Sequence, residues 1–152
     1  MKLIILAVGK GRGGPEATLT QGWLGRLPQG GSLVEVESKL PDNAKRTGDE
    51  SQRLLRAVPD GARLVALDPR GRDCSSEELA KLIGTWRDDG IGTTCFAIGG
   101  ADGHDQSLRQ RADKVISLGR ATWPHMLFRA MLAEQLYRAN SILSGHPYHR
   151  PS

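Results

Sequence analysis

The last residues of the chain hold its densest group of chemically active side chains. His146, Pro147, Tyr148, His149 and Arg150 bring two imidazoles, a phenol and a guanidinium into five positions. An imidazole suits general-base catalysis at neutral pH, an aromatic ring can stack on a nucleobase, and a guanidinium binds phosphate. We therefore predict that His149, Tyr148 and His146 act in catalysis and that Arg150 contacts RNA. The alternative is a disordered polar chain end, because termini are often poorly ordered.

A second pattern lies near the N-terminus. Gly9, Gly11 and Gly14 match the spacing GxGxxG between a predicted strand and a predicted helix, and Glu35 and Glu37 lie near the end of the next strand. In dinucleotide-binding domains such glycines admit a pyrophosphate, and a carboxylate about 20 residues further on binds the ribose. A Rossmann-type nucleotide-binding enzyme is therefore an alternative function.

The residues around these glycines argue against that alternative. Glu16 stands in the first turn of the predicted helix, where its charge would repel a pyrophosphate. The chain also has no room for a catalytic domain beside a complete dinucleotide fold. We interpret the segment as a flexible glycine-rich turn whose Lys10 and Arg12 contact phosphate.

Glycine and other small residues follow three predicted strands. The segments are residues 67–71, 98–103 and 118–125. In an open parallel sheet, ligands bind beyond the carboxyl ends of the strands, and glycine lets the backbone approach a ligand closely. Three such loops together predict a site that holds an adenine and a ribose through backbone hydrogen bonds.

Positive charge is concentrated in the last third of the chain. The whole chain holds 21 Lys+Arg and 17 Asp+Glu, whereas residues 106–152 hold seven basic and two acidic residues. Most of the basic residues are arginines, whose planar guanidinium binds phosphate with two parallel hydrogen bonds. We interpret this region as a nucleic-acid-binding face, with a solvated basic surface as the plainer alternative.

Length and composition exclude several classes of protein. A chain of 152 residues fits one domain, spanning 1–152, that needs no disulfide or metal for stability. The longest wholly apolar run, residues 3–8, is too short for a membrane helix or a signal peptide. Cys74 and Cys95 lack metal-ligand spacing, so we expect free thiols, no metal site and a cytoplasmic protein.

The hydrophobic pattern predicts strands that alternate with helices. Strands are predicted at 2–8, 33–37, 63–68, 93–98 and 114–118. Helices are predicted at 15–27, 42–58, 105–111 and 124–143, and a further one begins at the capping box that Ser75 forms with Glu78. The alternation predicts an α/β fold with a mostly parallel sheet and helices on both faces.

The predicted helix at 124–143 is apolar on more than one face. In a small protein, such a helix packs with one face on its own sheet and with another on a partner. This predicts a homodimer, and a deeply buried helix of a monomer is the alternative.

Several segments resemble a known family. They are Ala66-Leu67-Asp68 with Gly71, Ile98-Gly99-Gly100 with Gly103, residues 118–125, Leu136-Tyr137-Arg138-Ala139 and the closing HPYHR. Together they resemble the ribosomal RNA large subunit methyltransferase H family, a group of small SPOUT-class enzymes. The resemblance runs from Lys2 to Arg150 and is most specific in the last third. The loop residues Ala101, Asp102 and 119–121 depart from the residues usual in that family.

The resemblance implies a fold, a reaction and partners. It implies a C-terminal trefoil knot, S-adenosylmethionine as methyl donor, a homodimer and methylation of N3 of a pseudouridine in the 23S rRNA of the ribosome, with neither DNA nor a membrane as partner. The positions matching the donor-binding residues are Leu67, Gly99, Gly100, Leu118, Gly119, Arg120, Ala121, Thr122 and Trp123. The expected RNA contacts are Arg150, Arg129, Arg138, Lys10 and Arg12.

Removal of the N3 proton requires a base. The tail histidines are the first candidates, and His125 is the next. A non-catalytic module that binds RNA or the ribosome remains as an alternative function, and an assay of methyl transfer to ribosomes distinguishes it from the enzyme.

Overall fold

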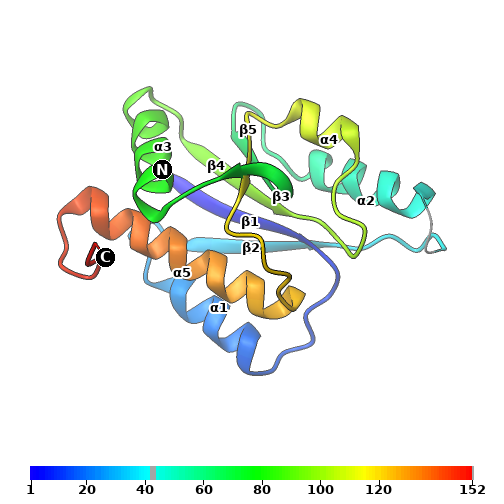
Figure 1. Ribbon diagram of the computed structural model, residues 1–152, viewed down its shortest axis with the longest axis horizontal. Helices are drawn as coiled ribbons and strands as arrows, with labels where there is room; N and C mark the ends of the chain where they lie inside the picture. The colour runs from blue at the N-terminus through cyan, green and yellow to red at the C-terminus, as the bar shows by residue number, and fades with distance from the viewer. Residues whose placement is uncertain (42–43, 152) are drawn as a thin grey trace.

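The computed structural model describes residues 1–41 and 44–151 and has one five-stranded sheet at its centre (Figure 1). The strand order is β2-β1-β4-β3-β5, and every neighbouring pair is parallel. The strands are β1 (Lys2–Val8), β2 (Gly31–Val36), β3 (Arg63–Asp73), β4 (Thr93–Ile98) and β5 (Lys114–Ser117). All carboxyl ends therefore lie at one edge of the sheet, where open parallel sheets bind ligands.

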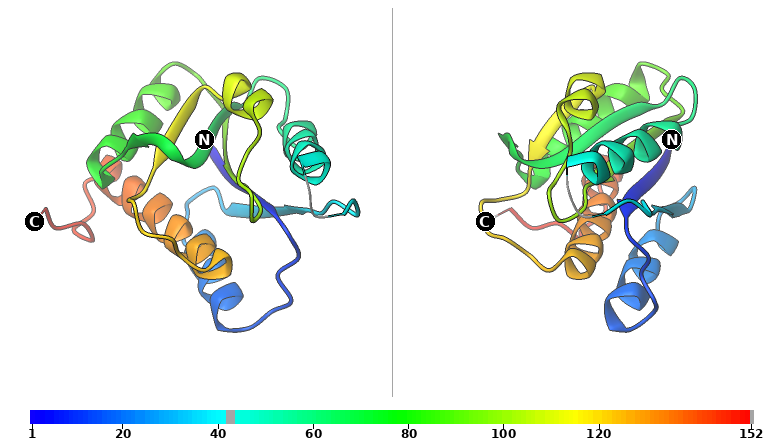
Figure 2. Two further views of the ribbon diagram at one scale, coloured as in Figure 1. Left: turned by 45° about the vertical axis from the view of Figure 1, so that its right-hand side comes forward. Right: turned by 90° about the vertical axis from the view of Figure 1, so that its right-hand side faces the viewer.

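Helices cover both faces of the sheet (Figure 2). One face carries α1 (Pro15–Gly25), α3 (Ser76–Asp88) and α5 (His125–Ser144), and the other carries α2 (Ala44–Arg56) and α4 (Gln106–Arg111). The prediction of an α/β fold with a parallel sheet and helices on both faces is confirmed. Within the described ranges, no helix is both long and apolar enough to cross a membrane.

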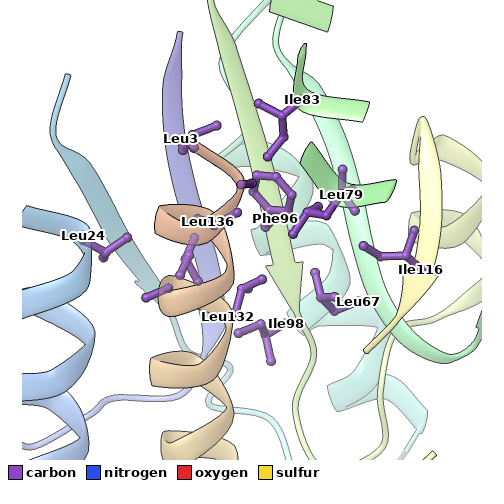
Figure 3. Packing of buried hydrophobic residues seen from close by; sticks show 14 of the residues in the cluster. Leu3, Leu24, Leu67, Leu79, Ile83, Phe96, Ile98, Ile116, Leu132 and Leu136 are labelled. Carbon is purple, nitrogen blue, oxygen red and sulfur yellow. The ribbon is translucent and has the colours of Figure 1, made fainter. Parts of the chain in front are cut away.

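The larger hydrophobic core lies between the sheet and α1, α3 and α5 (Figure 3). Phe96 of β4 packs there with Leu132 and Leu136 of α5, and all three are fully buried. On the opposite face, Leu54 of α2 and Leu108 of α4 pack in a second cluster. Because each face of β4 is covered, its sequence is a continuous apolar run and not an alternating one. Burial of one such large side chain stabilises the fold by about 1.5–3 kcal/mol.

Short polar motifs set the ends of the later helices. The Ser75 hydroxyl accepts a hydrogen bond from the amide of Glu78 at 3.1 Å, and the Glu78 carboxylate accepts one from the Ser75 amide at 3.0 Å. This confirms the predicted capping box. The Asp105 carboxylate accepts from the amide of Leu108 at 2.9 Å and caps α4. Gly145, with φ of 73°, ends α5 in a left-handed conformation that glycine adopts without strain.

Strand β3 is longer than its sequence indicates. The prediction ends it at residue 68, but after an irregularity its pairing with β5 resumes, with Arg72 opposite Ile116 and Asp73 opposite Ser117. Gly71 packs directly against the backbone of Ile116, and a Cβ at this position would lie 2.7 Å from the Ile116 carbonyl carbon. The sequence Pro-Arg-Gly has the composition of a turn, so the hydrophobic pattern does not predict this second pairing.

The other predicted elements are present, with ends shifted by a few residues. Helix α1 ends at Gly25, two residues earlier than predicted, and β2 begins at Gly31, two residues earlier than predicted. The first two residues of the predicted helix at 42–58, Asp42 and Asn43, lie outside the described residues. Helix ends are the least constrained part of a hydrophobic pattern, because the last turn makes few buried contacts.

Replacement of Gly71 by alanine should destabilise the fold by about 1–3 kcal/mol, because the methyl group would displace the Ile116 backbone and break the second β3–β5 pairing. Gly22→Ala is the matched control. Gly22 lies on the exposed side of α1 with open space around it, so alanine should stabilise the helix by about 0.5–1 kcal/mol. Urea unfolding measures both changes, and a Gly71→Ala protein as stable as the wild type would contradict the packing argument.

Candidate functional site

The irregular middle of β3, residues 67–70, and the loops that follow β4 and β5 meet around one cavity of ≈ 830 Å³, which we call the strand-end cavity. Its wall includes all nine residues predicted to bind the methyl donor: Leu67, Gly99, Gly100, Leu118, Gly119, Arg120, Ala121, Thr122 and Trp123. Val8 and Gly9 from the end of β1, and His125 and Phe128 from α5, line it as well. Segments that are far apart in the sequence therefore form one surface.

Glycine is required at two points of this wall for different reasons. A Cβ on Gly99 would lie 2.8 Å from the carbonyl carbon of Gly103, so any larger residue pushes the loop after β4 out of place. Gly119 has φ of 115°, a conformation that other residues adopt only with strain, and the space around it is open. The first glycine packs the loop on itself, and the second leaves room beside the backbone for a ligand.

The charged residues on the wall that were not predicted from the sequence include Asp68, Arg70, Glu50 and Arg46. Asp68 is buried, and Arg70 donates to both of its carboxylate oxygens at 2.9 Å. Burial raises the pKa of Asp68, but the hydrogen bonds and charge of Arg70 outweigh this effect and lower the pKa overall. Glu50 of α2 is also buried and lies 3.4 Å from Arg46. Asp68 and Arg70 stand inside a predicted loop, whereas nothing in the sequence connects Glu50 with this edge of the sheet.

Arg129 is the only buried arginine among the described residues, and its side chain is 1% exposed. Its guanidinium forms an ion pair with Glu35 and donates to the carbonyl oxygens of Val8 and Gly9 at 3.3 and 3.0 Å. Its Nε donates to Nε2 of His125 at 3.1 Å. This burial argues against the predicted RNA contact at Arg129, because the side chain is removed from solvent and its nitrogens already have acceptors.

The same network accounts for the N-terminal glycine pattern. Glu35, the carboxylate that would bind a ribose in a Rossmann-type enzyme, accepts hydrogen bonds from Arg129 and from the amide of Gly11. A Cβ on Gly11 would lie 2.7 Å from the end of the Met126 side chain. Gly11 thus allows the loop to pack against α5, and the acidic residue holds that loop in place. This arrangement argues against the dinucleotide-binding alternative.

His125 connects this network to the strand-end cavity. It stands at the first position of α5 and lines the cavity. Burial and the neighbouring positive charge of Arg129 lower its pKa, while the charge of Glu35 has the opposite, smaller effect. The ring is therefore neutral near pH 7, with Nε2 accepting from Arg129 and the proton on Nδ1.

The C-terminal tail packs on its own chain. Nε2 of His149 donates to Glu77 at 2.8 Å, and Nδ1 accepts from Arg138 at 3.1 Å. The Tyr148 hydroxyl donates to Glu134 at 2.8 Å, and its ring packs edge-on against Tyr137 with 5.0 Å between ring centres. The alternative of a disordered chain end does not describe this arrangement.

The tail and the strand-end cavity occupy different parts of α5. Glu134 and Arg138, which hold the tail, follow His125 by about 14 and 20 Å along the helix axis, given a rise of about 1.5 Å per residue. Figure 1 shows the tail beside the C-terminal half of α5, with the loop from β5 at the opposite end of the helix. Among the described residues that line the cavity, none belongs to the tail.

Two comparisons with known proteins both match this chain to methyltransferases. A family model described as "Predicted SPOUT methyltransferase" matches residues 1–149. This chain belongs to the SPOUT methyltransferase family. Proteins named "Ribosomal RNA large subunit methyltransferase H" are similar over its full length. The protein of Paramagnetospirillum magneticum is 51% identical over 152 residues, covering 99% of this chain and 100% of the relative, and that of Rhodospirillum rubrum is 49% identical over 151 residues, covering 99% of each.

The two faces of α5 have different surroundings. The inner face is fully buried at Leu132 and Leu136 and packs on the sheet of its own chain. The outer face carries Leu127 and Met131, which with Leu19 of α1 line a second cavity of ≈ 450 Å³. The predicted two-faced apolar character is thus present, and the outer face, not Leu132 and Leu136, is the surface free to meet another chain.

The remaining predicted RNA contacts differ in accessibility. Lys10, Arg12 and Arg150 are exposed. Arg138 is half-buried, pairs with Glu134 at 2.7 Å and lies over the ring of Tyr148. The exposed residues can reach phosphate directly, whereas Arg138 must give up an existing ion pair to do so.

Glu35→Gln should destabilise the protein by about 2 kcal/mol near pH 7, because it removes a charged partner from buried Arg129. Burial opposes ionisation of Glu35, but Arg129 and the Gly11 amide lower its pKa overall. The stabilisation is therefore complete above the ordinary carboxyl pKa and is lost as the pH falls through the lowered value. Unfolding curves at several pH values should show the stabilities of the wild type and Glu35→Gln converging below about pH 4.

Glu37→Gln, an exposed neighbour, is the matched control and should have the stability of the wild type at every pH. A difference between Glu35→Gln and the wild type that stays constant at all pH values would contradict the ion-pair argument.

Proposed function

We propose that this chain is an S-adenosylmethionine-dependent methyltransferase that acts on N3 of a pseudouridine in 23S rRNA. The observation that carries the proposal is that all nine predicted donor-binding residues line one cavity at the carboxyl edge of the sheet. The full-length relatives are named as methyltransferases of large-subunit ribosomal RNA, which supports the same substrate class here. We also propose that the chain is a single domain and that its C-terminal part forms the trefoil knot of the family.

The residues of the strand-end cavity fit the methyl donor. Its volume of ≈ 830 Å³ lies within the range of about 300–1,000 Å³ that is usual for small-molecule sites. Leu67, Ile98 and Leu118 offer apolar contacts to an adenine ring. The backbone beside Gly119 is open, so its polar groups are accessible to a nucleoside. The carboxylates of Glu50 and Asp68 on this wall are paired with Arg46 and Arg70, so the wall offers a cationic ligand polar groups and little net charge.

The protein's part in the reaction is to position the acceptor and to remove one proton. S-adenosylmethionine, when bound, supplies a methyl group on a positively charged sulfur. The N3 of a pseudouridine is protonated at neutral pH, so a base must take its proton before the nitrogen becomes a good nucleophile. We propose that His149 is this base, with the substrate nitrogen taking the place of Arg138 at its Nδ1, and that His146 and Tyr148 orient the nucleobase. Burial and the Glu134 contact raise the pKa of Tyr148, so its hydroxyl remains a hydrogen-bond donor.

These roles require a homodimer. On its own chain the tail lies about 14–20 Å along α5 from His125, as counted above, so it does not reach the strand-end cavity of that chain. A second copy packed on the outer face of α5 can bring its tail to this cavity. The apolar residues Leu19, Leu127 and Met131 on this face support such an interface, because a monomer gains nothing from exposing them.

The exposed basic residues suit a large RNA substrate. Lys10 and Arg12 belong to the loop that Arg129 and Glu35 hold beside α5, and Gly9 of the same loop lines the cavity. Arg150 follows the proposed base in the tail. We propose that these three side chains bind rRNA phosphates, so that ribosome binding weakens as the salt concentration rises.

Gly99→Val should abolish binding of S-adenosylmethionine, because the larger side chain would displace Gly103 and close the loop onto the cavity. Gly92→Ala is the matched control, since Gly92 lies at the other end of β4 with open space around it. Calorimetric titration with S-adenosylmethionine measures binding, and a labelled-methyl assay on ribosomes measures transfer. Donor binding without any transfer to 23S rRNA, 50S subunits or 70S ribosomes would favour a non-catalytic ribosome-binding module.

A mixture of two inactive variants tests the shared site. Gly99→Val keeps the tail but loses the donor site, and His149→Ala keeps the donor site but loses the base. If the tail of one protomer serves the cavity of the other, random mixed dimers contain one intact site, and the mixture should regain about a quarter of the wild-type activity. No recovery, with mixed dimers confirmed by mass spectrometry, would show that each tail serves its own chain. A His149→Ala protein that is active by itself would instead indicate that His125 is the base.

A further inference from the structure

Arg70 joins two walls of the strand-end cavity. It belongs to the loop after the first part of β3, and its Nε and Nη2 donate to the two carboxylate oxygens of Asp68, both at 2.9 Å. The same Nη2 donates to the backbone carbonyl of His104 at 3.1 Å. His104 lies in the loop after β4, so one guanidinium connects the loops that carry Leu67 and Gly99.

Both ends of this connection are fixed in the interior of the fold. The Asp68 side chain is fully buried, and a buried carboxylate requires a cation or several donors beside it. His104 is 2% exposed, and its Nε2 donates to the carbonyl of Ala97, near the carboxyl end of β4, at 3.0 Å. The charge of Asp68 and the hydrogen bonds it accepts raise the pKa of Arg70, so the guanidinium stays charged. Arg70 therefore spans two anchored points, although its own side chain is 56% exposed along the cavity.

We propose that Arg70 is a positioning residue that sets the separation of the β3 and β4 walls and thereby the affinity for the methyl donor. The inference rests on the proposed function, because it names the role of Arg70 in that donor site. The planar guanidinium is needed, since its fork holds a carboxylate with two nitrogens while one of them also reaches a carbonyl. Lysine carries the same charge on a single nitrogen and cannot hold both groups in this geometry.

A second arginine provides a matched comparison. Nη1 of Arg109, in α4, donates to the same His104 carbonyl at 3.1 Å. Among the described residues, Arg109 forms no hydrogen bond or ion pair with β3, and it does not line the cavity. Loss of Arg109 removes one hydrogen bond from the loop after β4 but leaves the connection between the two walls intact. Comparison of the two arginines therefore distinguishes two effects. Loss of Arg109 weakens only the anchoring of the loop after β4, whereas loss of Arg70 also removes the link that sets the distance between the β3 and β4 walls.

The test measures donor affinity and turnover in full-length Arg70→Lys, Asp68→Asn and Arg109→Ala. Calorimetry gives the Kd for S-adenosylmethionine, the ribosome methylation assay gives kcat and the donor KM, and thermal unfolding gives Tm. For Arg70→Lys we expect Kd and KM to rise about tenfold with kcat within about twofold of the wild type, as for lost binding that is equal in ground and transition states. Asp68→Asn should change in the same direction, and Arg109→Ala should keep wild-type affinity. Because lysine keeps a cation beside the buried Asp68 carboxylate, the Tm of Arg70→Lys should remain near that of the wild type.

Three outcomes would overturn the inference. The first is wild-type affinity in Arg70→Lys, and the second is equal weakening in Arg70→Lys and Arg109→Ala, which would mean that only anchoring of the β4 loop matters. The third is a fall in kcat with an unchanged donor KM. Failure of the proposed function has a different signature, because then the wild-type protein itself binds no S-adenosylmethionine.

Discussion

The buried guanidinium of Arg129 determines where the C-terminal helix lies. A cation removed from water must be compensated, and here the Glu35 carboxylate, the carbonyls of Val8 and Gly9 and the ring of His125 do this. These partners come from the ends of β1 and β2 and from the first turn of α5. They hold the start of α5 over the carboxyl edge of the sheet, which gives the strand-end cavity one of its walls. The rest of the helix then packs one face on the sheet and leaves the other face outside.

Two glycine-rich regions with similar composition have different uses, and neighbouring charges explain the difference. At the N-terminal loop, the amide of Gly11 is already bound to Glu35, so the loop is closed around the protein's own side chains. At the strand-end cavity, Asp68 is neutralised by Arg70 within the wall, and the backbone at Gly119 remains open. A glycine pattern therefore shows where another group can approach the backbone closely. Whether that group is a ligand or another part of the chain depends on the fold.

The sequence predicts correctly those features of the molecule that depend on a few adjacent residues. The continuous apolar run of β4, the capping box at Ser75 and the small residues after three strands each depend on a few adjacent positions, and the structure contains all of them. The sequence does not predict features that depend on contact with a residue far away in the chain. Arg129 was expected to contact RNA because it belongs to the basic last third of the chain, but its acceptors include Glu35, 94 positions away. The second part of β3 and the place of Glu50 in the cavity wall likewise follow from pairing that no local pattern contains.

The strand order also affects when the chain can fold during synthesis. β1 pairs with β4, so Lys2 lies opposite Thr93, and the first strand lacks one of its two neighbours until about two-thirds of the chain has been made. The main core then still lacks Leu132 and Leu136, which belong to the last helix. Contacts between residues so far apart slow folding, because a long loop must close before they form. A nascent chain of this kind leaves the ribosome with its apolar strands uncovered, and its core closes only when α5 has emerged.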